Sequence, residues 1–342
     1  MGKKWLFWFD EIGMKNDDLA GKKCANLGEL TRMQLPVPPG FAISVDAYEM
    51  FMNKTEAIQE IREYFDKHGR QNRTLDQWTE VSMTLRKIIE TQQMPIEMAQ
   101  TITSHYHELS RKCGVSDPAV SVRSAGRVSR PGQYETHLNV KGSDGLLRSI
   151  LKVWSSSFNP RSLAFRAQND MPIETDPIGI AILGMINART SGIMLTAVPH
   201  TGDDSKIVIE ANWGLGESVV SGAVTPDYFI LDKNSLDILE MKIGEKSKCI
   251  SCSEKGVIEE EVPFDKSSEF CLTNEELKEI AKYGKLIEEH FRGVPQDVEW
   301  AISSNGNNVF LLQTRPAVIA KKKSPTEKII DLIIGRRLCD PI

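Results

Sequence analysis

The sequence has no long hydrophobic run and no excess of positive charge. Its first apolar run ends after five residues at Asp10 and Glu11, which is too soon for the core of a signal peptide. No apolar segment approaches the ~20 residues that span a bilayer. The 42 basic and 47 acidic side chains give a net charge of −5, whereas dedicated nucleic-acid-binding proteins usually have a clear basic excess. We therefore predict a cytoplasmic protein that binds neither membranes nor nucleic acid.

Cysteine motifs and nucleotide-binding motifs of the common kinds are also scarce. Of six cysteines, only Cys249 and Cys252 form a CxxC pair, and a zinc site built on one such pair would lack ligands. We expect all six to be free thiols. The sequence contains no internal repeat and no P-loop ending in GK[ST].

The order of the segments predicts an α/β chain of two lobes. Polar residues with helical periodicity predict a helical insert at about 50–112, and residues 146–169 predict one long helix. We place the N-terminal lobe at 1–177, the C-terminal lobe at 178–318 and a tail at 319–342. Apolar runs in the second lobe predict strands, which are IGIAILGMI, SGIMLTAV, KIVIEANWG and DYFILD.

The last predicted unit is a pair of strands joined by a turn at Gly306. If the turn is centred there, Trp300 faces Leu312 and Ile302 faces Phe310, which gives one apolar face.

The opposite face of this hairpin carries the chemistry. The same register pairs Glu299 with Gln313 and Asp297 with Arg315. Hard oxygen ligands on neighbouring strands suit Mg²⁺, and an arginine beside them suits a phosphate held by that ion. From the hairpin alone, however, a merely solvated polar face is the more common outcome.

Two further positions point to a nucleotide but are weak alone. Lys23 follows a glycine at a predicted turn into a helix, where a lysine and the first helical amides can meet a phosphate. A solvated lysine is far more common. Glu217 follows the glycines of WGLGE and could hold a ribose hydroxyl, or could belong to a simple chain reversal.

The stretch Val122–Thr136, VRSAGRVSRPGQYET, concentrates three arginines on a glycine-bearing loop. Arg123 ends an apolar strand, where its head can reach a ligand crevice. Gly132 permits close approach of the backbone to a phosphate, and Gln133 and Thr136 can add donors. The alternative is an exposed loop whose charges serve solubility.

Together these segments resemble the ATP-binding N-terminal part of phosphoenolpyruvate synthase, pyruvate phosphate dikinase and rifampicin phosphotransferase. The similar pieces keep the family's order between about residues 5 and 318: GKKCANLGEL, PVPPGFAIS, SVRSA, PGQYETHLNV, SGIMLTAV, EANWGLGESVVSGAVTPDYF and DVEWA…LLQTRP. The resemblance implies an ATP-grasp-like fold with ATP and Mg²⁺ between two lobes, and it favours the ligand-binding interpretation of the hairpin.

The resemblance also implies roles for individual residues. Glu299 and Gln313 would hold the metal, and Arg315 would stabilise the phosphoryl group in transfer. The Gly184–Ile186 segment would contact adenine through its backbone, and Glu217 would approach the ribose. The implied nucleotide-binding residues are Lys23, Arg123, Gly132, Gln133, Thr136, Gly184, Met185, Ile186, Glu217, Asp297 and Gln313. The implied catalytic residues are Lys23, Arg123 and Arg315.

Three features depart from the family's pattern. Positions on either side of Lys23 carry Lys22 and Cys24 where glycines are usual, and Leu183 replaces a glutamine of the adenine-contacting strand, which would loosen adenine selection. The loop between Arg123 and Gly132 is shorter than in phosphoenolpyruvate synthase and lacks its acidic stretch. Two further arginines of that loop would offset the charge of ATP or meet a partner, namely Arg127 and Arg130.

The family passes phosphate from ATP to a histidine on a mobile domain, and none of the six histidines here has that motif. The chain also ends soon after QTRP. We therefore expect the ATP-binding half of a split enzyme, with a partner subunit that supplies the phosphohistidine and binds the small-molecule acceptor. The leading hypothesis is phenylphosphate synthase, which converts phenol, ATP and water to phenylphosphate, AMP and phosphate. The alternatives are a relative of phosphoenolpyruvate synthase or rifampicin phosphotransferase, and a non-catalytic nucleotide sensor.

Overall fold

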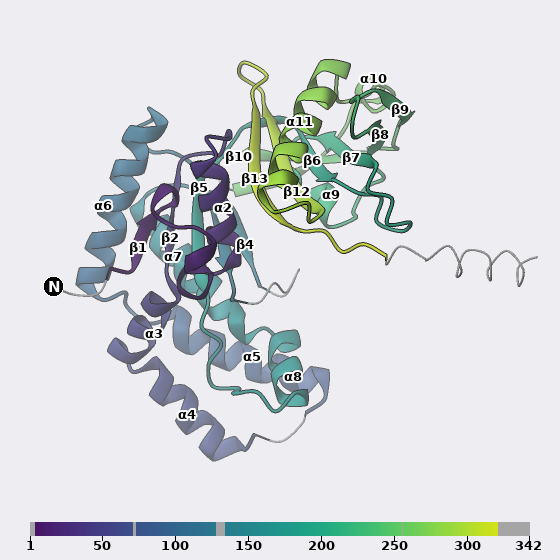
Figure 1. The fold of residues 1–342 in the computed structure, drawn as a ribbon. Helices are drawn as coiled ribbons and strands as arrows, with labels where there is room; N and C mark the ends of the chain where they lie inside the picture. The colour runs from purple at the N-terminus through teal and green to yellow at the C-terminus, as the bar shows by residue number, and fades with distance from the viewer. Residues whose placement is uncertain (1–3, 71–72, 128–133, 255, 321–342) are drawn as a thin grey trace, which may run out of the picture.

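A computed structural model describes residues 4–70, 73–127, 134–254 and 256–320. They form two lobes, each built on an antiparallel sheet (Figure 1), which confirms the predicted α/β class. The five-stranded sheet of the first lobe consists, in spatial order, of β1 (Leu6–Trp8), β2 (Gly40–Ile43), β5 (Gly179–Gly184), β3 (Val120–Ala125) and β4 (Thr136–Val140).

The two faces of this sheet pack against different helices because successive strand residues point to opposite sides. On β5, Ile180 and Ile182 join the larger core, whereas Ala181 and Leu183 face the cluster that includes α2 (Lys22–Arg32). The larger core is covered by α3 (Val45–Lys54), α4 (Ala57–His68), α5 (Leu75–Glu90), α6 (Ile96–Cys113), α7 (Ser143–Ser155) and α8 (Pro160–Gln168).

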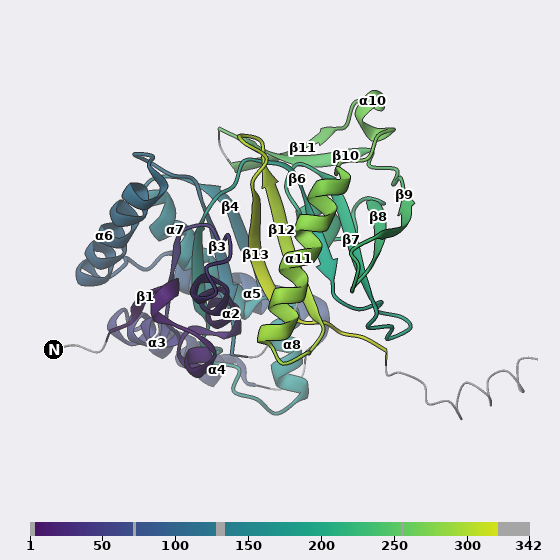
Figure 2. The same ribbon diagram turned by 45° about the horizontal axis from the view of Figure 1, so that its top comes forward.

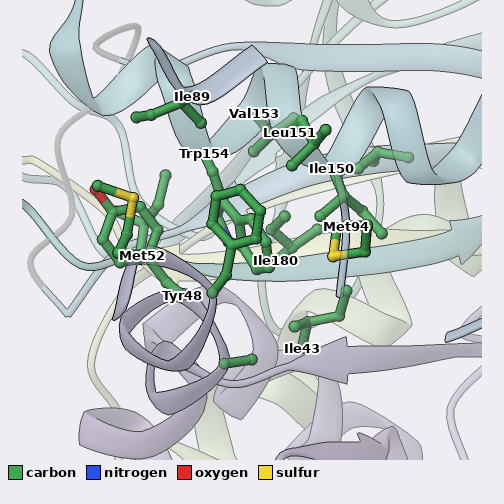
Figure 3. Close-up of a cluster of buried hydrophobic side chains, with 14 of the residues drawn as sticks. Ile43, Tyr48, Met52, Ile89, Met94, Ile150, Leu151, Val153, Trp154 and Ile180 are labelled. Atoms are coloured by element: carbon green, nitrogen blue, oxygen red, sulfur yellow. The ribbon is translucent and has the colours of Figure 1, made fainter. Parts of the chain in front are cut away.

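The predicted helical insert is therefore part of the lobe's main core. Figure 3 shows Trp154 of α7 among side chains from several elements, including Tyr48 of α3 and Ile180 of β5. Trp154 is fully buried, and its ring meets that of Tyr48 edge-on, with centroids 5.9 Å apart. Truncating such a side chain to alanine typically costs about 3–5 kcal/mol.

The single long helix predicted over 146–169 is wrong. The chain forms α7, a short 3₁₀ turn at Ser156–Phe158 and then α8, which begins at Pro160. A proline cannot donate the backbone hydrogen bond that a continuing helix requires, but it is well suited to a helix's first turn. The hydroxyls of Ser156 and Ser157 donate back to backbone carbonyls three residues earlier, and such bonds compete with the helical ladder.

The second lobe contains a six-stranded sheet covered on one face by α11 (Asn274–His290) (Figure 2). Thr273 and Glu276 form a capping box at the start of this helix. In spatial order the strands are β13 (Val309–Pro316), β12 (Gln296–Ser303), β6 (Ala188–Leu195), β7 (Lys206–Trp213), β8 (Asp227–Asp232) and β9 (Ile238–Lys242).

The change from one sheet to the other falls later than the sequence suggested. Strand β5 pairs with β2 and β3, so the first sheet extends to Gly184 and the second begins at Ala188. The predicted boundary at residue 177 would have assigned β5 to the wrong sheet. The apolar run of β5 resembles those of the second-lobe strands, and sequence alone does not say which strands it pairs with.

A separate two-stranded sheet and several short helices complete the described chain. The small sheet is the hairpin of β10 (Lys248–Ser253) and β11 (Gly256–Glu261). Among the described helices, none is both long and apolar enough to span a membrane. The short helices are the 3₁₀ turns Phe9–Glu11 and Met14–Asn16, and α1 (Asp17–Ala20), α9 (Glu217–Val220) and α10 (Phe264–Ser267).

Candidate active site

The β12–β13 hairpin places four polar side chains on one face of the second sheet. Glu299 lies opposite Gln313, and Asp297 lies opposite Arg315, both as predicted. Arg315 donates from Nε and Nη2 to Oδ2 of Asp297, at 2.8 and 2.7 Å. These side chains are half-buried or buried, so the polar face is not a freely solvated one.

A β-bulge separates this polar part of the hairpin from the part near the turn. Between Glu299 and Trp300 the register shifts, so Trp300 pairs with Leu311 and Leu312 is the extra residue. A bulge moves alternate side chains to the other face of a strand. It explains how Leu311 can face the core while Gln313 faces the site. Two predicted pairs on the turn side of the bulge are therefore wrong: Trp300 with Leu312, and Ile302 with Phe310.

The first lobe contributes two cations that meet this hairpin. Lys23 lies in the first turn of α2, and Arg123 lies on β3. Arg123 forms a short ion pair with Glu299 and donates from Nη1 to the carbonyl oxygen of Leu312, at 3.3 Å. Helix α2 is itself tied to β13, because Asn26 donates to the carbonyl of the residue after Gln313, at 2.7 Å. Figure 2 shows α2 beside β13, between the two sheets.

The electrostatics of Lys23 are unusual for an unliganded lysine. Burial, reinforced by the positive charge of Arg123, lowers its pKa to about 7, although Glu299 partly opposes the shift. The close approach behind this arrangement depends on Gly21, whose φ is +80° and whose hypothetical Cβ would lie 2.1 Å from the carbonyl oxygen of Ala125. Lys23 is thus a cation that an arriving phosphate would stabilise.

The carboxylates respond to the same surroundings in opposite directions. Burial acts to raise the pKa of Glu299, but the charges of Arg123 and Lys23 outweigh it, and the pKa is lowered. Burial raises the pKa of Asp297 despite its pairing with Arg315, and the charge of Glu299 adds to the rise.

The donor set fits a hard cation such as Mg²⁺. Gln313 is 7% exposed, and its Oε1 atom is buried without a hydrogen bond from the described residues, which is an arrangement that normally calls for a partner. It lies directly opposite Glu299, and Mg²⁺ prefers such oxygen ligands. No cluster of three or more His, Cys, Asp or Glu side chains in the described part of the chain could hold a metal ion. A cation here would therefore rely on Glu299, the amide of Gln313 and non-protein ligands.

An apolar cluster adjoins the polar groups. Thr136 lies opposite Arg123. Two residues after Thr136 comes Leu138, and two residues after Glu299 comes Ala301; both belong to the apolar cluster. The polar groups would therefore meet the phosphates of a nucleotide, and the apolar cluster its base. The cluster consists of Ala188, Leu215 and Ala301, with Leu138, Met185, Ile186, Ile250, Cys252, Val257 and Leu312 packed against them.

The structure does not bring all predicted residues to the cluster of charges. Glu217 is exposed at the start of α9, and among the described contacts none joins it to Lys23 or Arg123. Gly184 ends β5, next to Met185 and Ile186 of the apolar cluster. Arg127 donates from Nε to the carbonyl of Asp18, at 2.9 Å. Three predicted loop residues lie outside the described residues: Arg130, Gly132 and Gln133.

Two of the departures from the family pattern prove to be neighbours. Cys24 and Leu183 are both fully or almost fully buried and share one apolar cluster between α2 and the first sheet. Burial raises the pKa of Cys24 to about 12, so this thiol remains protonated. Leu183 therefore packs against α2 instead of lining the apolar cluster next to the charges, and the expectation that it loosens adenine selection stays a prediction.

The sequence interpretation missed Glu210 of β7. In the sheet, Ile193 of β6 lies between Glu299 and Glu210, so all three share one face. Burial raises the pKa of Glu210, and the negative charge of Asp297 adds to this. A carboxylate that interrupts the apolar strand KIVIEANWG was the signal that could have revealed it.

The two sheets meet at a group of polar side chains that consists of a lysine, two arginines, two carboxylates and a buried amide. This arrangement is suited to a nucleotide. A family model described as "Pyruvate phosphate dikinase, AMP/ATP-binding domain" matches residues 17–332. The chain belongs to this family, which confirms the resemblance inferred from the sequence.

Named relatives agree with this assignment. A probable phosphoenolpyruvate synthase from Methanocaldococcus jannaschii is 36% identical over 332 residues, which cover 95% of this chain and 28% of that protein. The phosphoenolpyruvate synthase of Pyrococcus furiosus is 31% identical over 371 residues, which cover 96% of this chain and 45% of that protein. The chain thus spans less than half the length of these relatives. Among solved structures, D-alanyl-alanine synthetase A from Vibrio cholerae is similar over 94% of this chain and 68% of that one, at 9% identity and a TM-score of 0.31.

Proposed function

We propose that this chain binds Mg-ATP and transfers a phosphoryl or pyrophosphoryl group to a histidine that lies outside this sequence, on a partner subunit. The observation that carries the proposal is the ion pair of Arg123 with Glu299. It joins the phosphate-binding cations of one lobe to the candidate metal ligands of the other. Such positioning and charge stabilisation are the main ways in which proteins accelerate phosphoryl transfer.

The residues of the chain would divide the work by charge. Lys23 and Arg123 would bind the phosphate oxygens from the first lobe. Arg315, held in orientation by Asp297, would face the group in transfer from the second lobe. Glu299 and Gln313 would hold Mg²⁺, which when bound neutralises negative charge on the phosphates.

The histidines of this chain support an external acceptor. All six lie in the described residues, and no hydrogen bond or ion pair there joins any of them to Lys23, Arg123, Glu299 or Arg315. Two of them are occupied in carboxylate contacts, with His290 beside Glu29 at 2.9 Å and His137 beside Glu135 at 3.5 Å. The remaining histidines are His68, His105, His107 and His200.

The identity of the final acceptor follows from the relatives only as a hypothesis. Because those reported above are named phosphoenolpyruvate synthases, we place a pyruvate-phosphorylating relative first. Phenylphosphate synthase, with phenol as the acceptor, remains the second candidate. The same cleft would serve both, since the acceptor is expected to bind on the partner.

The test is to incubate the chain with Mg-ATP labelled in the β- or γ-phosphate, alone and with a histidine-bearing partner protein. We expect AMP and a labelled partner histidine only in the mixture, and no label on this chain. Turnover retained after both Glu299→Ala and Arg315→Ala would contradict the assigned site. Adding pyruvate or phenol in parallel separates the two acceptors by their phosphorylated products.

A nucleotide-sensing subunit is the candidate from another class. It would bind ATP without turnover in every pairing, and its affinity would not depend on Arg315. Arg315 is held by two contacts to Asp297 Oδ2. An arginine fixed in this way favours the enzyme, because a sensor has no developing charge for it to stabilise.

A further inference from the structure

The β10–β11 hairpin is firmly attached to the second lobe. The side-chain amide of Asn212 donates to the carbonyl of Lys248 at 2.8 Å, and the backbone N–H of Leu215 donates to the carbonyl of Ile250 at 2.7 Å. Gly214 sits in the left-handed region, with φ +72°, and its hypothetical Cβ would lie 2.3 Å from that same Ile250 oxygen. The loop after β7 is therefore built to receive β10 closely.

A buried ion pair fixes the end of the hairpin where β10 begins. Lys246 and Asp227 are both fully buried, and Lys246 Nζ donates to Asp227 Oδ1 and, at 3.1 Å, to the carbonyl of Ser267. The two oxygens of Asp227 also accept backbone N–H groups from Gly244 at 2.9 Å and Cys271 at 2.8 Å. Separating such a pair leaves uncompensated buried charges, so the pair holds this end of the hairpin closed.

At its other end, the hairpin is hydrogen-bonded to the first lobe by the side chain of Asn139. Nδ2 of Asn139, on β4, donates to the carbonyls of Ser253 and Gly256, each at 2.6 Å. Asn139 is 7% exposed and has a φ of +54°, a conformation that asparagine tolerates better than most residues. One amide therefore closes the tip of the hairpin onto β4.

The hairpin has one face turned to the apolar cluster. Ile250, Cys252 and Val257 pack there against Leu138 and the residues after β5. Cys249, on the same strand, is outside that cluster and lies opposite Glu260. The hairpin thus forms a wall of the place that would hold the base.

We propose that the β10–β11 hairpin is a strap that closes the site at the end where the base of the nucleotide would lie. Asn139 is the positioning residue whose hydrogen bonds hold this strap closed, and we call it the latch. The nucleotide enters and leaves when the two hydrogen bonds of Asn139 break. The opposite end of the hairpin stays attached to the second lobe through Lys246 and Asp227. This inference rests on the proposed function for its ligand, but the latch itself can be tested without nucleotide.

The experiment compares two thiols on one strand. The chain is treated with a small alkylating reagent, and the modification rates of Cys252 and Cys249 are resolved by peptide mass spectrometry. Asn139→Asp keeps the shape of the side chain but replaces the donor amide with an acceptor facing two carbonyls. Asn139→Gly removes the amide and retains the left-handed backbone. The matched control is Asn307→Asp, at an exposed asparagine with a φ of +52° in the turn between β12 and β13.

We expect both Asn139 variants to raise the rate at Cys252 about ten-fold, the factor for loss of two neutral hydrogen bonds, with Cys249 and the control unchanged. The dissociation rate of a fluorescent ATP analogue should rise by a similar factor, and bound analogue should protect Cys252 more than Cys249. Unchanged labelling of Cys252, or equal increases at both thiols, overturns the latch. If the unaltered chain binds no nucleotide, the proposed function fails, and the labelling comparison still decides whether the latch exists.

Discussion

The two lobes contribute different sets of charges to the candidate site. The first lobe supplies cations from separate elements, Lys23 on α2 and Arg123 on β3, whereas the second supplies Asp297, Glu299 and Arg315 from a single hairpin. The cations lower the pKa of Glu299, and the pKa of Lys23 itself is lowered by burial and by Arg123. The charge of Glu299 is therefore stabilised by cations of the other lobe, whereas Asp297 is paired with Arg315 of its own hairpin.

Reversing the first lobe's charge should have the largest effect. Arg123→Glu removes a side chain that would donate hydrogen bonds to the phosphates of ATP, and it places a carboxylate against Glu299. We expect turnover with the partner to fall by at least about 10³-fold, with ATP binding lost in calorimetry. Arg62→Glu is the control, because this exposed arginine lies on α4, which covers the core of the first lobe. An equal loss in both variants would show that overall charge matters and not the lobe junction.

Removing the second lobe's own cation should have the next largest effect. Arg315→Ala is expected to lower turnover by about 10²-fold and to weaken ATP binding much less. Without Arg315, which opposes the rise, the already raised pKa of Asp297 should rise further. If ionised Asp297 is needed, the acid limb of the pH–rate profile then moves to higher pH. An unmoved limb would show that Asp297 does not titrate in the reaction.

The lowered pKa of Lys23 makes ATP binding depend on pH. The free lysine loses its proton above about pH 7, whereas a bound phosphate raises the pKa again, so binding takes up a proton at higher pH. Affinity should fall by up to about ten-fold per unit above pH 7. Calorimetry in buffers of different ionisation enthalpy measures the uptake. Lys23→Met should bind weakly with a flat profile, and a persisting slope would assign the proton to another group.

The smallest effect on binding is expected away from the junction. Leu183→Gln restores the family's usual residue but buries an amide beside Cys24, so it should lower the free energy of unfolding in urea by about 1–3 kcal/mol. Its ATP affinity should stay within about two-fold. Adding Cys24→Gly should cost less than the sum of the two changes if the cavity admits the amide. A large change in ATP-over-GTP preference would instead support the predicted role in adenine selection.

The difference between the lobes also explains what could be predicted from the sequence. The Glu299–Gln313 and Asp297–Arg315 pairs follow from strand alternation about a local turn. Nothing local places Lys23 beside them, and only the family resemblance suggested it.

Other features were beyond reach for physical reasons. The bulge at Leu312 has no composition signal, so the apolar pairs near the turn came out one residue off. The sheet membership of β5 is set by pairing with β2 and β3, which are distant in sequence. The latch at Asn139 joins β4 to a hairpin more than a hundred residues away.

Because of the bulge at Leu312, the β12–β13 hairpin has two pairing registers, one on each side of the bulge. Insertions or shifted pairs on the turn side of the bulge need not change which side chains face the ligand. The register of the polar half is set at the other end of the hairpin, where Gln296 pairs with Pro316. A hairpin that kept all its residues but continued the turn-side register without the bulge would place Gln313 opposite Val298 and would turn Gln313 and Arg315 toward the core. Alignments and designs of this domain should therefore count from Pro316 backward and not from Gly306 forward.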